Sequence, residues 1–244
     1  MGEISIDPKF NIHETYKKVR ILNPYRNQSK SLFPTDGLVS YYKLDETSGN
    51  QVIDSWGVNN GINYGATIGA IGKVGTAYQF ASSKYCEATF DFTPTSFTIS
   101  FWIYPTSLTD YNQQVSAKSV WNAFNFHTTS FGDVYCGTNI PSRFSPSELP
   151  SGTLELNMWQ NFTYTFEGGV NSTGTGNFYK NGVLMASKTQ RKPLNFTGIK
   201  LGAPSANTIM GRLDEFSIHN RSLSGAEVLI IYNNGKGSSH LKHR

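Results

Sequence analysis

Short β-prone runs, each ended by a turn signal, constrain the fold of this chain more than any other feature. The run from Phe97 to Pro105 carries bulky side chains on both of its alternating faces, which predicts a strand in the middle of a sheet. Asn181 and Gly182 stand between two β-prone flanks and indicate a hairpin, because a type I′ turn requires positive φ at both central positions. Such runs, recurring about every eight to twelve residues, predict an all-β sandwich or jelly roll.

The run from Leu213 to His219 predicts a closing strand with one buried face. Its alternation places Asp214, Phe216 and Ile218 together on the apolar side. A carboxylate at the rim of a buried face is costly unless something pairs with it. We therefore expect Asp214 to have a partner, and a bound cation is one candidate.

A short helix is expected directly after this strand. Ser224 and, three residues later, Glu227 have the spacing of a capping box. The run Asn233, Asn234 and Gly235 is typical of a helix C-terminus. The pattern predicts a helix that ends at Tyr232.

The 244 residues divide into an arm, a domain and a tail. Residues 1–36 are too polar to form a core, and their prolines exclude a long helix. We expect an arm that becomes ordered by docking on its own domain or on a neighbouring subunit, in a homo-oligomer or a larger assembly. Residues 37–235 are expected to form the jelly-roll domain, and residues 236–244 a basic tail.

The formal net charge of +4 comes from the two ends of the chain, and the middle is nearly neutral. A nucleic-acid-binding domain usually concentrates basic residues on one face of its folded body, so we expect no nucleic-acid partner. No apolar run is long enough to span a bilayer, so membrane insertion is not expected. The first residues lack a basic start followed by an apolar core, so no secretory signal is expected.

Cys86 and Cys136 are too few for a disulfide framework and too far apart for a zinc knuckle. They either pack as two small buried apolar side chains or form one disulfide. We favour the first interpretation, because free cysteine packs as a hydrophobic residue.

Two loop regions carry residues suited to binding. Around Asp54 and Asn59, side-chain and backbone oxygens crowd into one short loop, which is typical of calcium sites and also of ordinary Asn/Gly turns. The segment from Thr106 to Met158 predicts short strands and long surface loops, and loops on a rigid sandwich commonly carry the binding function. The candidate ligand-binding residues of this segment are Trp121, His127, Asp133, Tyr135 and Arg143.

Seven segments, taken in order, resemble the laminin-G-like, or concanavalin A-like lectin/glucanase, jelly-roll family. They are GLVSYYKLDE, DSWGVNNG, GKVGTAYQF, FTISFWIYP, MWQNFTYTF, FYKNGVLMAS and GRLDEFSIHNRSLSGAEV. The resemblance implies two antiparallel sheets with the first and last strands side by side. It also implies that Asp54, Asn59 and Asp214, with nearby backbone carbonyls, hold a structural calcium ion. Trp56 and Val58 depart from the family, which commonly has small or polar residues there.

The chain lacks the catalytic signature of the glucanases on this fold, which use paired glutamates on one strand. Glu155 and Glu215 are isolated, and no nucleophile elbow, phosphate-binding loop or zinc motif is present. We therefore expect a protein that is not an enzyme. It is either a glycan-binding module, with Trp121 or Tyr135 stacking on sugar rings, or a structural part of a larger assembly.

We favour a bacteriophage-type virion surface component, such as a decoration, head-fibre or tail-associated protein. It would be held by residues 1–36 and would adhere to host glycans through its lectin-like domain. The expected lack of a secretory signal fits a protein that is assembled inside the cell. The alternative is a carbohydrate-binding module of a secreted or cell-surface protein.

Overall fold

The computed structural model describes residues 33–109, 112–118, 123–138, 142–169, 173–195, 197–205 and 209–237. The chain divides into two units, Met1–Ser31 and Leu32–Arg244, and all described residues belong to the second. Most of the expected arm and most of the expected tail lie outside the described residues. Phe33, which is buried, already belongs to the folded unit.

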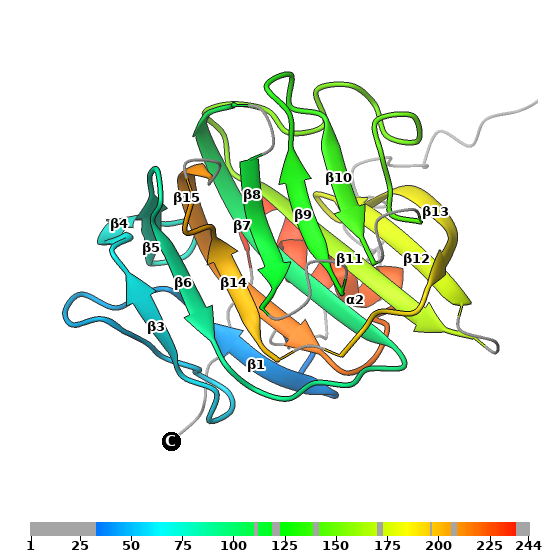
Figure 1. The fold of residues 1–244 in the computed structure, drawn as a ribbon, viewed down its shortest axis with the longest axis horizontal. Coiled ribbons are helices and arrows are strands. Elements are labelled where there is room, and N and C mark those ends of the chain that lie inside the picture. Colours follow the sequence, from blue (N-terminus) through cyan, green and yellow to red (C-terminus); the bar gives the residue numbers. More distant parts are fainter. Residues whose placement is uncertain are drawn as a thin grey trace, which may run out of the picture. The chain divides into compact units, whose positions relative to one another are not determined.

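The described residues form strands, one short helix and one 3₁₀ turn (Figure 1). The elements are β1 (Leu38–Tyr42), β2 (Gln51–Val52), β3 (Gly61–Tyr64), β4 (Thr67–Ile71), β5 (Thr76–Phe80), β6 (Tyr85–Ala88), β7 (Phe97–Ser107), β8 (Asn112–Ala117), β9 (Asn125–Thr128), β10 (Val134–Gly137), β11 (Gln160–Gly168), β12 (Thr173–Lys180), β13 (Val183–Arg191), β14 (Ile199–Gly202), β15 (Met210–His219), α2 (Gly225–Tyr232) and η1 (Asn233–Gly235). Within these described ranges, no helix is both long and apolar enough to cross a membrane.

The strands form two antiparallel sheets, as the sequence predicts. The eight-stranded sheet has the order β13-β12-β11-β7-β15-β5-β4, with β1 also paired to β15. The seven-stranded sheet has the order β10-β9-β8-β14-β6-β3-β2. In Figure 1 the seven-stranded sheet lies in front and α2 lies behind. The pairing of β1 with β15 confirms that the first and last strands of the domain are neighbours.

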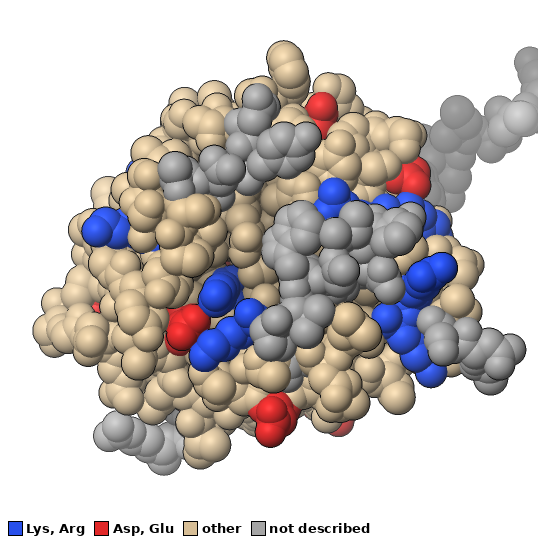
Figure 2. All heavy atoms as spheres, in the orientation of Figure 1, with Lys and Arg blue, Asp and Glu red and all other residues tan. Residues whose placement is uncertain are grey.

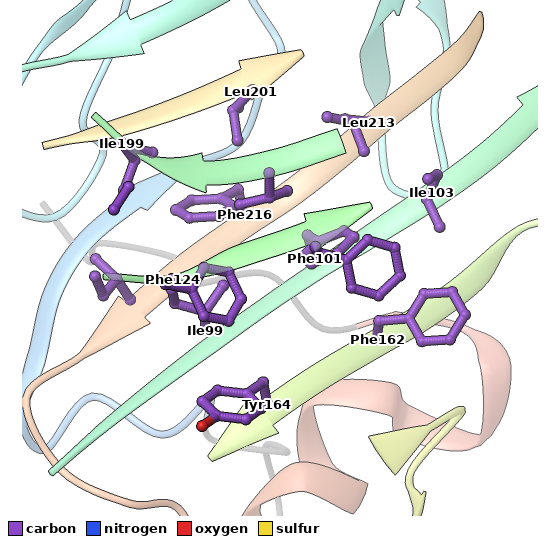
Figure 3. Close-up of a cluster of buried hydrophobic side chains, with 14 of the residues drawn as sticks. Ile99, Phe101, Ile103, Phe124, Phe162, Tyr164, Ile199, Leu201, Leu213 and Phe216 are labelled. Atoms are coloured by element: carbon purple, nitrogen blue, oxygen red, sulfur yellow. The ribbon is translucent and has the colours of Figure 1, made fainter. Parts of the chain in front are cut away.

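Aromatic side chains fill the space between the sheets. Phe101 of β7 meets Phe126 of β9 edge-on, with ring centroids 5.1 Å apart, and so links the two sheets. Figure 3 shows part of this core, to which β7, β11, β14 and β15 contribute. Cys86 and Cys136 are free and buried in the same core, which confirms the interpretation of both as packed apolar residues.

A second, smaller apolar cluster lies between the eight-stranded sheet and α2. Its buried members are Phe33, Leu38, Tyr41, Tyr179, Leu223, Val228 and Ile231. The predicted capping box is present, because the Ser224 hydroxyl accepts from the Glu227 amide at 3.3 Å and Glu227 Oε2 accepts from the Ser224 amide at 2.9 Å. The helix ends at Asn233, whose φ of 48° is left-handed. This helix therefore closes one outer face of the sandwich.

Two further local predictions are confirmed. Strand β7 lies inside the eight-stranded sheet, between β11 and β15, and both of its faces are buried. Asn181 and Gly182 connect β12 to β13 with φ values of 52° and 78°, the signs that a type I′ turn requires. Each of these two features follows from the residues of its own segment.

The predicted alternation of β15 is wrong at its centre. Glu215 has a φ of 52°, and the pairing of β15 with β7 shifts register between Asp214 and Ser217. This bulge inserts one residue, so Asp214 lies opposite Trp102 on the outer, α2 side of the sheet. Phe216 instead points into the core between the sheets. Asp214 and Phe216 are therefore on opposite faces.

Candidate functional site

The Asp54 carboxylate, a predicted calcium ligand, is occupied by backbone amides. Its Oδ1 accepts from the amides of Tyr41, Trp56 and Gly57 at 3.0, 3.1 and 3.0 Å. Its Oδ2 accepts from the Asn59 amide at 3.1 Å. The positive ends of these N–H dipoles face the carboxylate where a cation would need to approach. Asp54 therefore holds its own loop together and fits a calcium site poorly.

Asn59 is also committed to the fold. Its side-chain amide donates to the Ser40 hydroxyl at 2.8 Å, and its backbone carbonyl accepts from the Tyr42 hydroxyl at 2.6 Å. Both bonds tie the loop to β1. The backbone carbonyl oxygen of Asn59, which is the kind of oxygen that calcium binds, is thus already hydrogen-bonded.

Asp214, the third predicted ligand, differs from Asp54. Its Oδ2 accepts from the amides of Lys73 and Val74 at 2.7 and 2.9 Å, while its Oδ1 is buried without a hydrogen-bond partner. Burial raises the pKa of this carboxyl to about 7, against the lowering effect of the two amides. The described residues contain no group of three or more His, Cys, Asp or Glu side chains that could hold a metal ion. Calcium stays a prediction, and Asp214 is the residue best suited to it.

Two of the other predicted residues, His127 and Tyr135, lie on the outer face of the seven-stranded sheet. Phe126 and Cys136 of β9 and β10 point into the core, so the alternating residues His127 and Tyr135 point outward. Figure 2 looks onto this face and shows basic and acidic groups side by side near its middle. In contrast to the outer face of the eight-stranded sheet, no helix of the described chain covers it.

Three of the predicted residues, His127, Tyr135 and Arg143, come together here. The His127 and Tyr135 rings are stacked with centroids 4.8 Å apart, and the Arg143 guanidinium lies 4.6 Å from the Tyr135 ring centre. Arg143 also donates to the Asn125 side chain at 3.3 Å. Burial, and then the nearby Arg143 charge, lower the pKa of His127 to about 4, so the imidazole is neutral at pH 7. Because two neighbours already engage the Tyr135 ring, it is poorly placed as a stacking platform for a sugar.

Asp133 and Trp121 are not part of this stack. Asp133 precedes β10 and accepts from the Ser151 hydroxyl at 2.8 Å and the Gly152 amide at 3.1 Å, so it ties one loop to another. Trp121 lies outside the described residues. Its predicted role in stacking on sugars stays a prediction.

A groove that the sequence did not reveal lies beside the stack. It has a volume of about 360 Å³ and is lined by Gln113, Ser116, Ala117, Lys118, Lys200 and residues 203–205. Gln113 is the cross-strand neighbour of His127, which places the groove on the same outer face. Amide, hydroxyl and ammonium groups line it, and these are the donors and acceptors that recognise polar ligands. Alternation within residues 112–117 would place Gln113 and Ser116 on opposite faces, and the register shift between Gln113 and Val115 brings them to the same one, so no signal in the sequence points to this pair.

An aromatic pair lies on β6, the strand next to β14, and on β3, the strand after it. The rings of Tyr64 and Tyr85 are stacked with centroids 4.6 Å apart, and Tyr64 is 40% exposed. Tyr85 is paired with Gly202, which directly precedes the groove residues 203–205. An aromatic surface beside a polar groove is the combination that sugar rings require, since they present both C–H and hydroxyl faces.

A match to a family model shows to which family this chain belongs. Residues 79–229 match the model described as the concanavalin A-like lectin/glucanases superfamily, and this range covers more than half of the chain. The chain belongs to the concanavalin A-like lectin/glucanases superfamily. A search of curated proteins found no match.

Solved structures share the superfamily fold with this chain. The sialidase of Trypanosoma rangeli in complex with the inhibitor DANA matches with a TM-score of 0.64 and 14% identity, over 84% of this chain and 34% of the sialidase. The binding domain of botulinum neurotoxin serotype D matches with a TM-score of 0.61 and 16% identity, over 81% of this chain and 52% of that one. The receptor binding domain of botulinum neurotoxin type G gives a TM-score of 0.60 and 16% identity, over 81% and 51%.

These likenesses establish the fold of this superfamily member and no more. The chain spans about a third of the sialidase and about half of the toxin domains. The sialidase is an enzyme, whereas the neurotoxin structures are binding domains. The shared lectin-like sandwich therefore occurs both in enzymes and in binding proteins. The function has to be argued from the site.

Proposed function

We propose that this chain is a binding protein that is not an enzyme and that holds glycans on the outer face of its seven-stranded sheet. The observation that carries the proposal is the groove next to β6, whose Tyr85 stacks on the exposed Tyr64 of β3, on the face that no described helix covers. The groove offers hydrogen-bond donors and acceptors, and the tyrosine pair offers an aromatic surface. The superfamily membership is consistent with this use of the fold.

The charge distribution on the sheet supports binding without catalysis. Glycoside hydrolysis by the common mechanism needs two carboxyl groups flanking the scissile bond. Among the described strands of the seven-stranded sheet, Glu87 is the one carboxylate, and it is paired with Lys118 and Lys200 at 3.3 and 3.9 Å. A second carboxyl group at the groove would be required before a hydrolytic function could be argued.

For the biological setting we keep the phage virion surface component, with residues 1–36 as its docking arm and possible assembly as a homo-oligomer. The scattered apolar residues and prolines of this segment support it, because such arms become ordered by lying on a partner. The second candidate is a carbohydrate-binding module of a secreted or cell-surface protein. The match to only about a third of the sialidase favours that candidate, since the fold can form part of a larger chain.

A glycan array with the full chain tests the glycan-binding function. We expect selective binding, and a loss of about tenfold or more in the Tyr64→Ala variant, because stacking and hydrogen bonding act together. Leu229→Ala, which changes a half-exposed residue of α2, is the matched control and should bind like the wild type. An array without any binding, or equal binding by Tyr64→Ala, would remove the glycan proposal.

Two further measurements separate the candidates. Incubation with each bound polysaccharide should release no reducing ends, and release would show that the chain is an enzyme. Shortening the chain to begin at Leu32 leaves the second compact unit whole. We expect this shortening to abolish co-assembly with virion particles, and unchanged assembly would favour the module of a secreted or cell-surface protein.

A further inference from the structure

We propose that the groove is selective for sugars that carry a carboxylate, such as uronic or sialic acid residues, and that Lys118 and Lys200 bind this group. The inference rests on the proposed glycan-binding function and adds the chemical class of the ligand. It is carried by the charges that line the groove.

Two ammonium groups share one carboxylate at the groove. Lys118 Nζ lies 3.3 Å from Glu87 Oε1, and Lys200 Nζ lies 3.9 Å from Glu87 Oε2. The second distance is beyond that of a hydrogen bond, so the Lys200 ammonium keeps donors for a ligand. One negative charge cannot neutralise two positive ones, and both lysines line the groove. The groove therefore has a surplus positive charge.

The two lysines are held in place rather than free in solvent. Their side chains are 26% and 24% exposed, and Lys118 Nζ also donates to the Thr89 hydroxyl. Ordered side chains lose less conformational entropy when a ligand binds. A partly buried ammonium is also less screened by salt than a fully exposed one. Both effects favour a specific charge-assisted contact.

The rest of the groove fits a sugar acid better than a simple anion. Gln113 Nε2 donates to the Ser116 hydroxyl, which leaves Gln113 Oε1 as an acceptor and the Ser116 O–H as a donor for ring hydroxyls. Tyr85 lies on β6, next to β14, and stacks on Tyr64 of β3.

A nucleic acid would need a row of cations to follow its phosphates. In the described strands of the seven-stranded sheet, Lys200 is the one lysine or arginine, and Lys118 directly follows β8. A single carboxylate per sugar matches this local charge.

The experiment compares one polymer in two charge states. Titration calorimetry with the full chain would use oligogalacturonate and, separately, an α2,8-linked sialic acid oligomer. The same oligogalacturonate with its carboxyl groups methyl-esterified is the neutral probe. We expect binding to at least one acidic probe, at least tenfold weaker binding to the ester, and a Kd that rises with salt. The acidic probe that binds identifies the source of the carboxylate.

Variants assign the contact to the two lysines. Lys200→Gln and Lys118→Gln should each weaken binding of the acidic probe by about tenfold, the value of one charge-assisted hydrogen bond. Lys236→Gln removes the same charge from an exposed position after η1 and should bind like the wild type. The melting temperature of all three should stay close to that of the wild type, because ion pairs at a protein surface contribute at most about 1 kcal/mol to stability.

Different failures have different meanings. Equal binding of the acidic and esterified probes, or equal losses in Lys200→Gln and Lys236→Gln, would overturn the carboxylate inference and leave the glycan function standing. Displacement of the acidic probe by inorganic phosphate or by single-stranded DNA at equal concentration would also overturn it, since the groove would then be a general anion site. Absence of binding to every glycan would overturn both proposals.

Discussion

The two outer faces of this sandwich are used in opposite ways. On the eight-stranded sheet, Trp102 is 1% exposed, because α2 lies over it and Tyr232 stacks on its ring at 5.7 Å. On the seven-stranded sheet, Ile62 and Tyr64 are 46% and 40% exposed. The chain covers the first face with its own helix, so that face contributes to stability. No described helix covers the second face, and it is the face that we propose binds glycans.

Covering the eight-stranded sheet also buries polar groups. On the covered face, the hydroxyls of Ser100 and Thr163 are hydrogen-bonded at 2.8 Å, whereas Trp102 Nε1, Ser217 Oγ and both carboxyl oxygens of Glu215 are buried without a partner. Each such group costs free energy, and burial raises the pKa of Glu215 well above its ordinary value. Covering a sheet is therefore stabilising only because the apolar contacts of α2 outweigh these costs.

The largest expected effect tests this contrast with two isoleucines. Ile231→Ala removes a buried side chain from the cluster under α2 and should lower the free energy of unfolding by about 2–5 kcal/mol. Ile62→Ala, on the open face, should lower it by less than about 1 kcal/mol. Urea denaturation of both variants measures the two values. Equal losses would mean that the open face is also part of the stabilising core.

Much of the fold could be predicted from the sequence because the signals are local. The turn at Asn181 and Gly182 and the capping box of Ser224 and Glu227 depend on residues only a few positions apart. The bulge at Glu215 could not be predicted, because alternation in β15 gives no sign of the extra residue. It is defined by the pairing with β7, more than a hundred residues earlier in the chain.

The site was less predictable for the same reason. His127, Tyr135 and Arg143 were proposed individually, and only the pairing of β9 with β10 brings the first two into a stack. The groove lysines come from the end of β8 and from β14, which are joined in the sheet but distant in sequence. Asp54 and Asp214 looked alike as candidate calcium ligands. Their hydrogen bonds, which depend on separate loops, distinguish them.

The calcium prediction concerns the covered side of the molecule, where Asp214 has one unpartnered oxygen. After chelation, calcium at a hundred times its dissociation constant should raise the free energy of unfolding by about 2.7 kcal/mol. The gain should vanish in Asp214→Asn, which loses the charge that calcium requires. Thermal unfolding of both proteins with and without calcium measures this gain in stability. An unchanged melting temperature in the wild type would exclude this metal as a structural cofactor.

The last test concerns the pH dependence of Asp214. Its folded pKa of about 7 lies above the ordinary value, so the neutral form is favoured by folding. This contribution is full below about pH 4 and is lost as the pH rises to about 7. Asp214→Asn can still accept from Lys73 and Val74 but cannot ionise, so in chelator at pH 8 it should be more stable than the wild type by about 4 kcal/mol, because a rise of about three pKa units corresponds to about 1.4 kcal/mol per unit.

The difference between the two proteins should disappear near pH 4, where the wild-type carboxyl is neutral. His219 acts in the opposite direction, because burial lowers its pKa to about 4 and its contribution is lost as the pH falls from about 6.5. Since His219 is present in both proteins, its effect cancels when their unfolding free energies are subtracted. Urea unfolding at pH 4, 6 and 8 gives that difference. A constant difference across this range would mean that folding does not raise the pKa of Asp214.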